Sequence, residues 1–179
     1  QDQLKISQEF GNFEEVCGLL ANLGDAYAVS GNINLAKNYY EEQRVLAESK
    51  GLHAYVGTSY NGIGFVFVKQ GKIVQAIDCY FKALDSYREL EDDDKQLELL
   101  VGIGLNYRKL EECEKAIECF EQALELAKYI ENRKEETQIR IDLAEIFFKI
   151  EKRDLAISQI EKAEEGLQSI KAPWSTSLM

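Results

Sequence analysis

The side chains that could perform chemistry are few and far apart in this sequence. His53 is the only histidine among the 179 residues, and no serine, cysteine or carboxylate stands with it in a pattern that would pair a nucleophile with a base. A lone histidine gives no basis for acid–base or nucleophilic catalysis. The sequence therefore predicts no catalytic residue and a protein that is not an enzyme.

The four cysteines form no recognisable metal or redox motif. None belongs to a Cys-x-x-Cys pair, and Cys79 and Cys119 are far apart in the sequence. Zinc sites and redox-active thiols need closer and more regular spacing. We interpret the cysteines as small apolar packing residues in a reducing compartment. They are Cys17, Cys79, Cys113 and Cys119.

Two other short patterns fall short of ligand-binding motifs. Asp92-Asp93-Asp94 lacks the remaining ligands of a calcium loop, and one of these aspartates is expected to cap a helix N-terminus. Gly62-x-Gly64 and Gly102-x-Gly104 lack the third glycine of a dinucleotide loop and lie inside segments that are expected to be helical. We therefore predict neither a metal nor a cofactor.

The charge balance narrows the class of partner. The net charge is −11, from 21 basic and 32 acidic residues, whereas binding to nucleic acid depends on lysine and arginine that neutralise phosphates. The longest nearly apolar run, Gly62 to Val68, is much shorter than the ~20 residues of a membrane helix. The N-terminal residues lack the basic and apolar regions of a signal peptide. We expect a cytoplasmic protein that binds no nucleic acid and does not insert into a membrane.

A recurrence of residue types organises the chain. The interval is fixed at about 40 residues, and a fixed interval of this length indicates an array of stacked repeats. The pattern is clearest in the stretch 100–127, and the same types return one and two periods earlier and one period later. The residues of the clearest copy are Leu100, Ile103, Gly104, Tyr107, Ala116, Phe120, Ala123 and Leu124.

Within each period the apolar residues follow helical spacing. Val16, Leu20 and Leu23 lie on one helix face, and Gly31-Asn32 ends that helix. The Gly62–Val68 run could be a buried strand by composition, but its register with the other repeats favours a helix. Further helices are expected at about 34–50, 54–70, 74–90, 95–110, 114–130, 135–149 and 154–170. The turns at Glu111-Glu112 and Glu151-Lys152 are expected to be type I, which accepts these residue types.

We expect residues 1–179 to form one domain, which the repeat register divides into successive repeats. Residues 4–12 align with residues 124–132 at three full periods, so we expect residues 3–12 to be the end of a preceding repeat and the chain to be part of a longer array. Pro173 is expected to end the last helix. The expected repeats are residues 13–51, 52–92, 93–132 and 133–171, followed by a tail at 172–179.

With this register, the sequence resembles the tetratricopeptide-repeat family. The family pattern of Leu-Gly and Tyr on the first helix, then Ala, aromatic and Ala on the second, reads here as Ile103-Gly104, Tyr107, Ala116, Phe120 and Ala123. Gln43, Ala144 and Arg140 depart from that pattern. The units are longer than the usual repeat and are similar to the long repeats of Pins-type adaptors, kinesin light chains, rapsyn and bacterial signalling scaffolds. The resemblance implies an all-α, right-handed α-solenoid of paired antiparallel helices.

The resemblance also implies where a partner binds, because the first helices of such repeats line a concave groove. The expected groove residues are Ala21, Asp25 and Ala28, then Asn61, Phe65 and Val68, then Val101, Leu105 and Arg108, and finally Ile141, Glu145 and Phe148. The second, third and fourth sets offer a helix or an extended peptide a largely apolar floor with a few polar groups. The alternative is that Phe65, Leu105 and Ile141 only pack against neighbouring repeats.

Three lysines recur at one position of the repeat. Lys69, Lys109 and Lys149 could form a basic column for an acidic peptide, or could simply interact with the negative ends of their helices. The lysine and asparagine clamp of chaperone-binding family members is absent. The corresponding residues here are Ala21, Asp25, Gly62, Glu98 and Gly102.

Together these features predict a non-catalytic scaffold that binds a protein or peptide partner in the groove. Two alternatives stay open. The chain could be the regulatory module of a larger signalling protein or enzyme, with an internal segment in the groove. It could also assemble with itself through the exposed faces of its terminal repeats.

Overall fold

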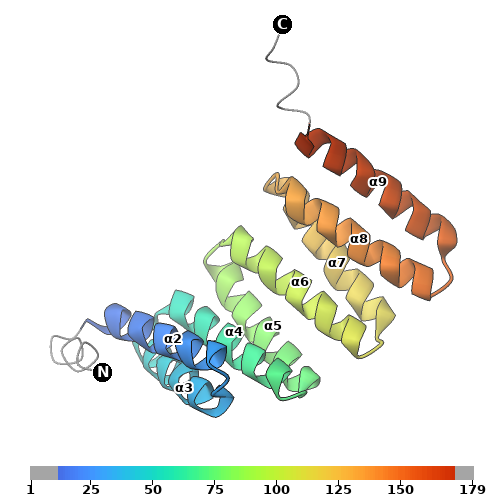
Figure 1. The fold of residues 1–179 in the computed structure, drawn as a ribbon. Coiled ribbons are helices and arrows are strands. Elements are labelled where there is room, and N and C mark those ends of the chain that lie inside the picture. The colour runs from blue at the N-terminus through green and yellow to red at the C-terminus, as the bar shows by residue number, and fades with distance from the viewer. Residues whose placement is uncertain (1–11, 172–179) are drawn as a thin grey trace, which may run out of the picture. The chain divides into compact units, whose positions relative to one another are not determined.

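The chain folds into helices joined by short turns (Figure 1). The structure is a computed structural model that describes residues 12–171, with side chains described up to residue 168. Within that range there are eight helices and no strand. Each lies within two residues of its expected bounds, and Gly62–Val68 is helical. The helices are Phe13–Val29 (α2), Ile33–Lys50 (α3), His53–Lys69 (α4), Ile73–Glu89 (α5), Asp93–Lys109 (α6), Cys113–Tyr129 (α7), Arg133–Lys149 (α8) and Arg153–Lys171 (α9).

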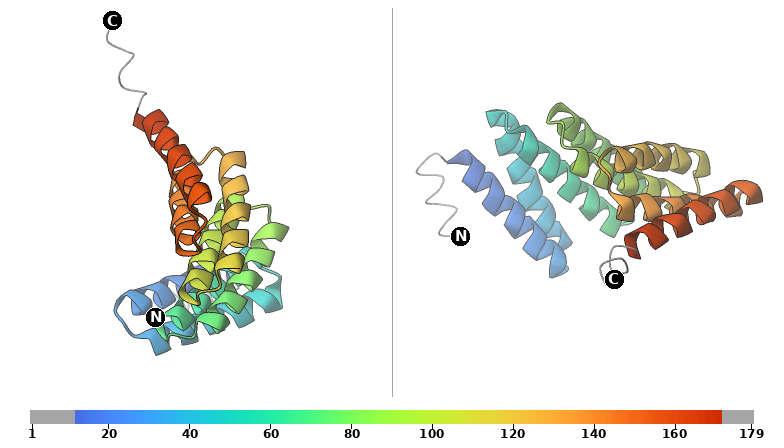
Figure 2. Two further views of the ribbon diagram at one scale, coloured as in Figure 1. Left: turned by 90° about the vertical axis from the view of Figure 1, so that its right-hand side faces the viewer. Right: turned by 90° about the horizontal axis from the view of Figure 1, so that it is seen from above.

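The chain divides into two compact units, Gln1–Leu99 and Leu100–Met179, with the division inside α6. In unit 1, α2 packs against α3, α4 packs against α5, and α4 also contacts both α3 and α2. In unit 2, α8 packs against α7 and α9, and Figure 2 shows α8 and α9 side by side. The single domain over 1–179 and its repeat boundaries stay a prediction. The expected features at residues 3–11 and 172–179, including the helix end at Pro173, lie outside the described residues.

Every turn between consecutive helices has the same geometry. A residue one or two positions past the end of each helix adopts a positive φ, from +54° to +83°, at positions 31, 51, 71, 91, 111, 131 and 151. Glu112 N–H donates to the Tyr107 carbonyl, and Glu111 N–H donates to the Arg108 carbonyl. This pair of bonds defines a Schellman motif.

The expectation of type I turns at Glu111 and Glu151 is therefore wrong. Both glutamates take the left-handed conformation that glycine takes at positions 31, 51 and 71. The residue that follows each left-handed position stands at the N-cap of the next helix. Among these residues, the Asp92 carboxylate accepts a hydrogen bond from Lys95 N–H at 3.0 Å, as expected for that acidic run.

The core of unit 1 is built around the ring of Tyr40. A Cβ placed on Gly24 in α2 would lie 2.5 Å from the ring, and one placed on Gly62 in α4 would lie 2.6 Å from it. The Tyr40 hydroxyl donates to the Asp25 carboxylate at 2.6 Å. Burial and then this hydrogen bond raise the pKa of Tyr40. The absence of two side chains thus lets one ring join three helices.

The same pairing of glycine with an aromatic ring recurs in the next two repeats. A Cβ on Gly64 would lie 2.6 Å from the Tyr80 ring, and one on Gly104 would lie 3.0 Å from the Phe120 ring. The small residues that share this register are buried and allow the close approach. They are Ala36, Ala76, Ala116 and Ala156.

The turns give a stability test in which two opposite substitutions have opposite effects. Gly71→Ala should destabilise the protein by about 1 kcal/mol because alanine is strained at a positive φ, and no neighbouring atom complicates the change. Glu131→Gly should stabilise it by up to about 1 kcal/mol for the same reason, less the added freedom of the unfolded chain. Urea unfolding followed by circular dichroism measures both. A loss of stability in Glu131→Gly would contradict the turn assignment.

The Tyr40 ring gives a second test with a matched control. Gly24→Ala should destabilise the protein by about 1–3 kcal/mol, because the added methyl group overlaps a ring that also lies close against Gly62. Gly18→Ala in the same helix meets no atom within 4 Å and should stabilise by up to about 1 kcal/mol through helix propensity. Thermal melting compares the pair, and equal shifts would show that the ring does not fill the space beside Gly24.

Candidate functional site

The residues expected to line a groove fall in both units. Asn61 and Val68 of α4 are half-buried, and Phe65 is exposed with the Lys69 ammonium 5.0 Å from its ring centre. The set on α2 also lies in unit 1, and unit 2 holds the other two sets, on α6 and α8. Because Phe65 and Leu105 belong to different units, a groove that runs through all the repeats stays a prediction.

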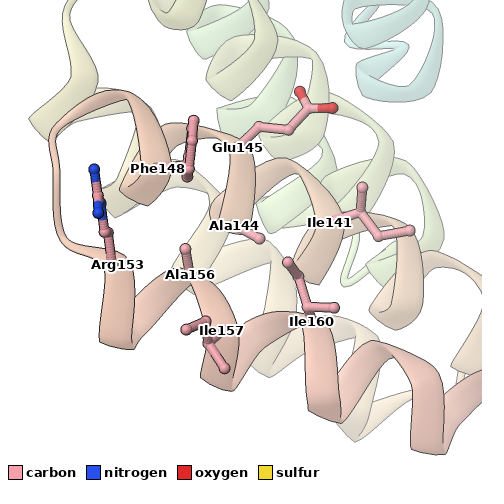
Figure 3. Close-up of a pocket in the computed structure, with 8 residues that line it drawn as sticks. All are labelled: Ile141, Ala144, Glu145, Phe148, Arg153, Ala156, Ile157 and Ile160. Atoms are coloured by element: carbon pink, nitrogen blue, oxygen red, sulfur yellow. The ribbon is translucent and has the colours of Figure 1, made fainter.

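One pocket brings expected groove residues together, and it lies between α8 and α9 in unit 2 (Figure 3). Its volume is about 410 Å³. Three of the expected groove residues line it from α8. Its full lining is Ile141, Ala144, Glu145 and Phe148 from α8, with Arg153, Ala156, Ile157 and Ile160 from α9.

The pocket is apolar and open to solvent. Phe148 is 68% exposed, and Ile157 and Ile160 are also exposed. Figure 3 shows the side chains of Ile160 and Ala144 turned toward the space between the two helices, with Arg153 at one end. Adjacent exposed apolar side chains of this kind are typical of an interaction site.

The expected groove residues include three of the four α8 residues of this pocket and none of its α9 residues. Ala144, Ala156 and Ile160 stand one period after Gly104, Ala116 and Phe120, so the repeat pattern predicts that they pack between helices. Arg153 and Ile157 belong to no expected set. A signal for the α9 side is that no helix among the described residues follows α9 to cover these positions.

An ion-pair cluster lies beside the pocket on the α6 and α8 faces of unit 2. The Arg108 guanidinium donates to the Asp142 and Glu145 carboxylates, each at 2.7 Å. The Asp142 side chain is only 9% exposed, so Arg108 compensates a nearly buried charge. Two of the expected groove residues, Arg108 and Glu145, are therefore already paired with each other within the chain. Arg108 also pairs with Asp142, which the sequence analysis did not single out.

The three recurring lysines have different surroundings. Lys149 donates to Glu111 at 2.9 Å, and this hydrogen bond lowers the pKa of the Glu111 carboxyl and raises that of Lys149. Lys69 lies over Phe65, and Lys109 is exposed. A basic column formed by all three would join both units and stays a prediction.

The four cysteines are buried as free thiols. Burial raises the pKa of Cys17 and Cys79, and it raises the pKa of Cys119 to about 11. Such thiols carry little thiolate at neutral pH, as expected for packing residues. In the part of the chain that the structure describes, no three His, Cys, Asp or Glu side chains are arranged to hold a metal ion. No helix in that part has the length and apolar character needed to span a membrane.

The two ion pairs of unit 2 should contribute very differently to stability. Arg108→Ala leaves the nearly buried Asp142 without its cation and should cost about 1–3 kcal/mol. Lys149→Ala breaks an ion pair between two exposed side chains and should leave the free energy of unfolding almost unchanged. Urea unfolding of both variants measures the difference. Equal and small losses would mean that the Asp142 charge is solvated by other means.

Comparison with known proteins places the chain in a family. The family model for the tetratricopeptide repeat matches residues 15–89 and 95–169. The chain is similar to response regulator aspartate phosphatase E of Bacillus subtilis (strain 168), with 32% identity over 73 residues. That match covers 40% of this chain, which spans 19% of the phosphatase's length.

Two solved structures share the fold at low sequence identity. BtubC (BKLC) from P. vanneervenii superposes with a TM-score of 0.80 at 16% identity, over 94% of this chain and 78% of that one. The Rap conjugation gene regulator of the plasmid pLS20, in complex with the Phr* peptide, superposes with a TM-score of 0.67 at 17% identity, over 89% of this chain and 44% of that one. The repeat motifs, the all-α fold and the family match agree, and the chain belongs to the tetratricopeptide-repeat family.

Proposed function

We propose that this chain is a non-catalytic protein-interaction module that binds a helical or extended segment of a partner protein through unit 2. The observation that carries the proposal is the open apolar pocket between α8 and α9, where Phe148 and Ile157 are exposed together. Burying such side chains contributes roughly 25 cal/mol per Å² of apolar surface. A partner with matching apolar residues gains affinity there.

The composition of the site supports a protein partner over a nucleotide or nucleic acid. The pocket wall is almost entirely aliphatic and aromatic, and Arg153 is its one cation. Phosphate groups require several donors or cations in one place, whereas apolar segments require contiguous apolar surface. With a net charge of −11, the chain is also unsuited to polyanions. We place its action in the cytoplasm, consistent with four free cysteines.

A second candidate is that the chain is a regulatory part of a larger signalling protein. The similarity to response regulator aspartate phosphatase E, of which this chain spans 19%, favours it. The pLS20 Rap regulator, whose structure contains the Phr* peptide, is a protein of this fold that binds a peptide. In this version the pocket serves the same binding role within a longer polypeptide.

The test is a selection of peptides from a display library on the whole chain, followed by affinity measurement with two variants. Phe148→Asp places a charge in the pocket and should weaken the selected peptides at least tenfold, or about 1.4 kcal/mol. Val45→Asp is the matched control, because Val45 is similarly exposed, at 59%, but lies on α3 in unit 1. Circular dichroism should show unchanged helix content in both variants.

The results separate the possibilities. Peptides that bind the Phe148→Asp variant as well as the parent chain would move the site elsewhere. If the double variant Phe65→Ala/Leu105→Glu lost peptide binding and Phe148→Asp did not, the binding site would lie on the remaining expected groove residues. Concentration-dependent sedimentation in the absence of peptide would favour self-assembly through terminal repeats.

A further inference from the structure

The pocket between α8 and α9 corresponds, in the repeat register, to the place where α4 lies on α2 and α3. Four of its lining residues stand three full periods after their counterparts in repeat 1. The counterparts, Ala28, Ile33, Ala36 and Tyr40, pack in one cluster with Ile63, Val66 and Phe67 of α4. The corresponding pocket residues are Phe148, Arg153, Ala156 and Ile160. In unit 1 a helix covers this surface, and in unit 2 no helix among the described residues covers it.

The contacts between α3 and α4 show which side chains a docked helix meets. Tyr40 lies against Gly62, and the Lys37 ammonium lies 5.4 Å from the Phe67 ring centre. Further along α3, the Arg44 guanidinium lies 5.7 Å from the Tyr60 ring centre. The α9 residues in register with Lys37, Tyr40 and Arg44 are Ile157, Ile160 and Glu164.

These three positions change the chemistry of the surface. Ile157 and Ile160 of α9 stand where α3 has a lysine and a tyrosine, so the open face of α9 is more apolar than that face of α3. Arginine becomes Glu164, which is exposed, and Glu161 and Glu165 on the same helix are exposed as well. The side chain of Glu164 has no ion pair among the described residues. A helix docked here therefore meets an apolar stripe and then an uncompensated carboxylate.

Residue size also differs between the two surfaces. The Tyr40 ring requires glycine at positions 24 and 62, since a Cβ at either would overlap it. In unit 2 the ring is replaced by Ile160, and Ala144 stands where the glycine of the first helix stands. The smaller isoleucine no longer requires glycine in the incoming helix. The surface thus accepts helices that could not replace α4.

We infer that this pocket docks an amphipathic helix of a partner protein, oriented on α8 and α9 as α4 is on α2 and α3. The helix carries a lysine or arginine opposite Glu164, in the position of Tyr60. Its apolar residues follow at three, six and seven positions further on, where α4 has Ile63, Val66 and Phe67. The inference rests on the proposed function and specifies the partner segment as a helix with this pattern.

Charge argues against a second copy of this chain as the occupant. The helix that would continue the array, α2, carries Glu14 and Glu15 in its first turn and contains no lysine or arginine. In the α4-like orientation Leu20 of α2 would stand where α4 has Tyr60, so no cation of α2 would face Glu164. A partner helix with a basic residue at that position supplies the missing cation.

The test uses a stapled helical peptide with Lys, Ile, Val and Phe at the relative positions 0, 3, 6 and 7, and alanine and glutamine elsewhere. A control peptide of the same composition has its lysine on the opposite face. Fluorescence anisotropy with the whole chain should give at least threefold tighter binding of the first peptide, the scale of one exposed ion pair. Phe148→Asp should abolish the binding of both.

A charge exchange tests the contact with Glu164. Glu164→Lys should weaken the lysine peptide about fivefold and strengthen a peptide with glutamate at position 0, as expected for a pair worth about 1 kcal/mol. Glu165→Lys is the matched control, because it makes the same charge change one residue further around α9. It should alter neither affinity more than twofold.

The outcomes distinguish this inference from the proposed function. If library peptides bind through Phe148 but the lysine peptide does not bind, or Glu164→Lys and Glu165→Lys act equally, the helix assignment is overturned and the interaction site stands. If no peptide of either kind depends on Phe148, both are overturned. If the lysine peptide binds and follows the Glu164 exchange, both are supported.

Discussion

The packing of an aromatic ring against a glycine is the contact on which the repeats depend. Tyr40 occupies space that side chains at Gly24 and Gly62 would fill, and its hydroxyl is held by Asp25. No helix of this length buries enough surface alone, so the close approach allowed by glycine supplies much of the stability. Tyr80 with Gly64 and Phe120 with Gly104 repeat the contact. The last described repeat replaces both partners, with Ile160 and Ala144.

Replacing the aromatic ring and the glycine changes the surface that the last described repeat presents to a neighbouring helix. Where an aromatic ring meets glycine, the surface is complementary to one particular helix, and in unit 1 that helix is α4. Where Ile160 meets Ala144, the surface is apolar, open and less selective in shape. The pocket of unit 2 is thus a packing surface of the fold without its neighbour among the described residues. In the interaction that we propose, the specificity for a partner depends more on charge, through Glu164 and Arg153, than on a close fit.

Two basic residues near this surface, Arg108 and Lys149, already form ion pairs within the chain. Arg108 is bound to Asp142 and Glu145, and Lys149 is bound to Glu111. A ligand that used Arg108 would have to compete with a nearly buried carboxylate, which is costly to leave unpaired. The exposed apolar side chains have no such competitor. This difference favours apolar contacts as the source of affinity in unit 2.

The sequence by itself determined the positions of the helices. Packing residues such as Ala116 and Phe120 are needed wherever two helices of a repeat meet, so they recur at a regular period. That period gives the bounds of each helix to within two residues. It did not determine the left-handed glutamates at 111 and 151, since hydrogen bonds across the turn override the preference of the residue. It did not reveal the pairing of Arg108 with Asp142, which is distant in the sequence. Only the tertiary structure decided that Ile157 and Ile160 are exposed, because exposure depends on whether another helix covers them.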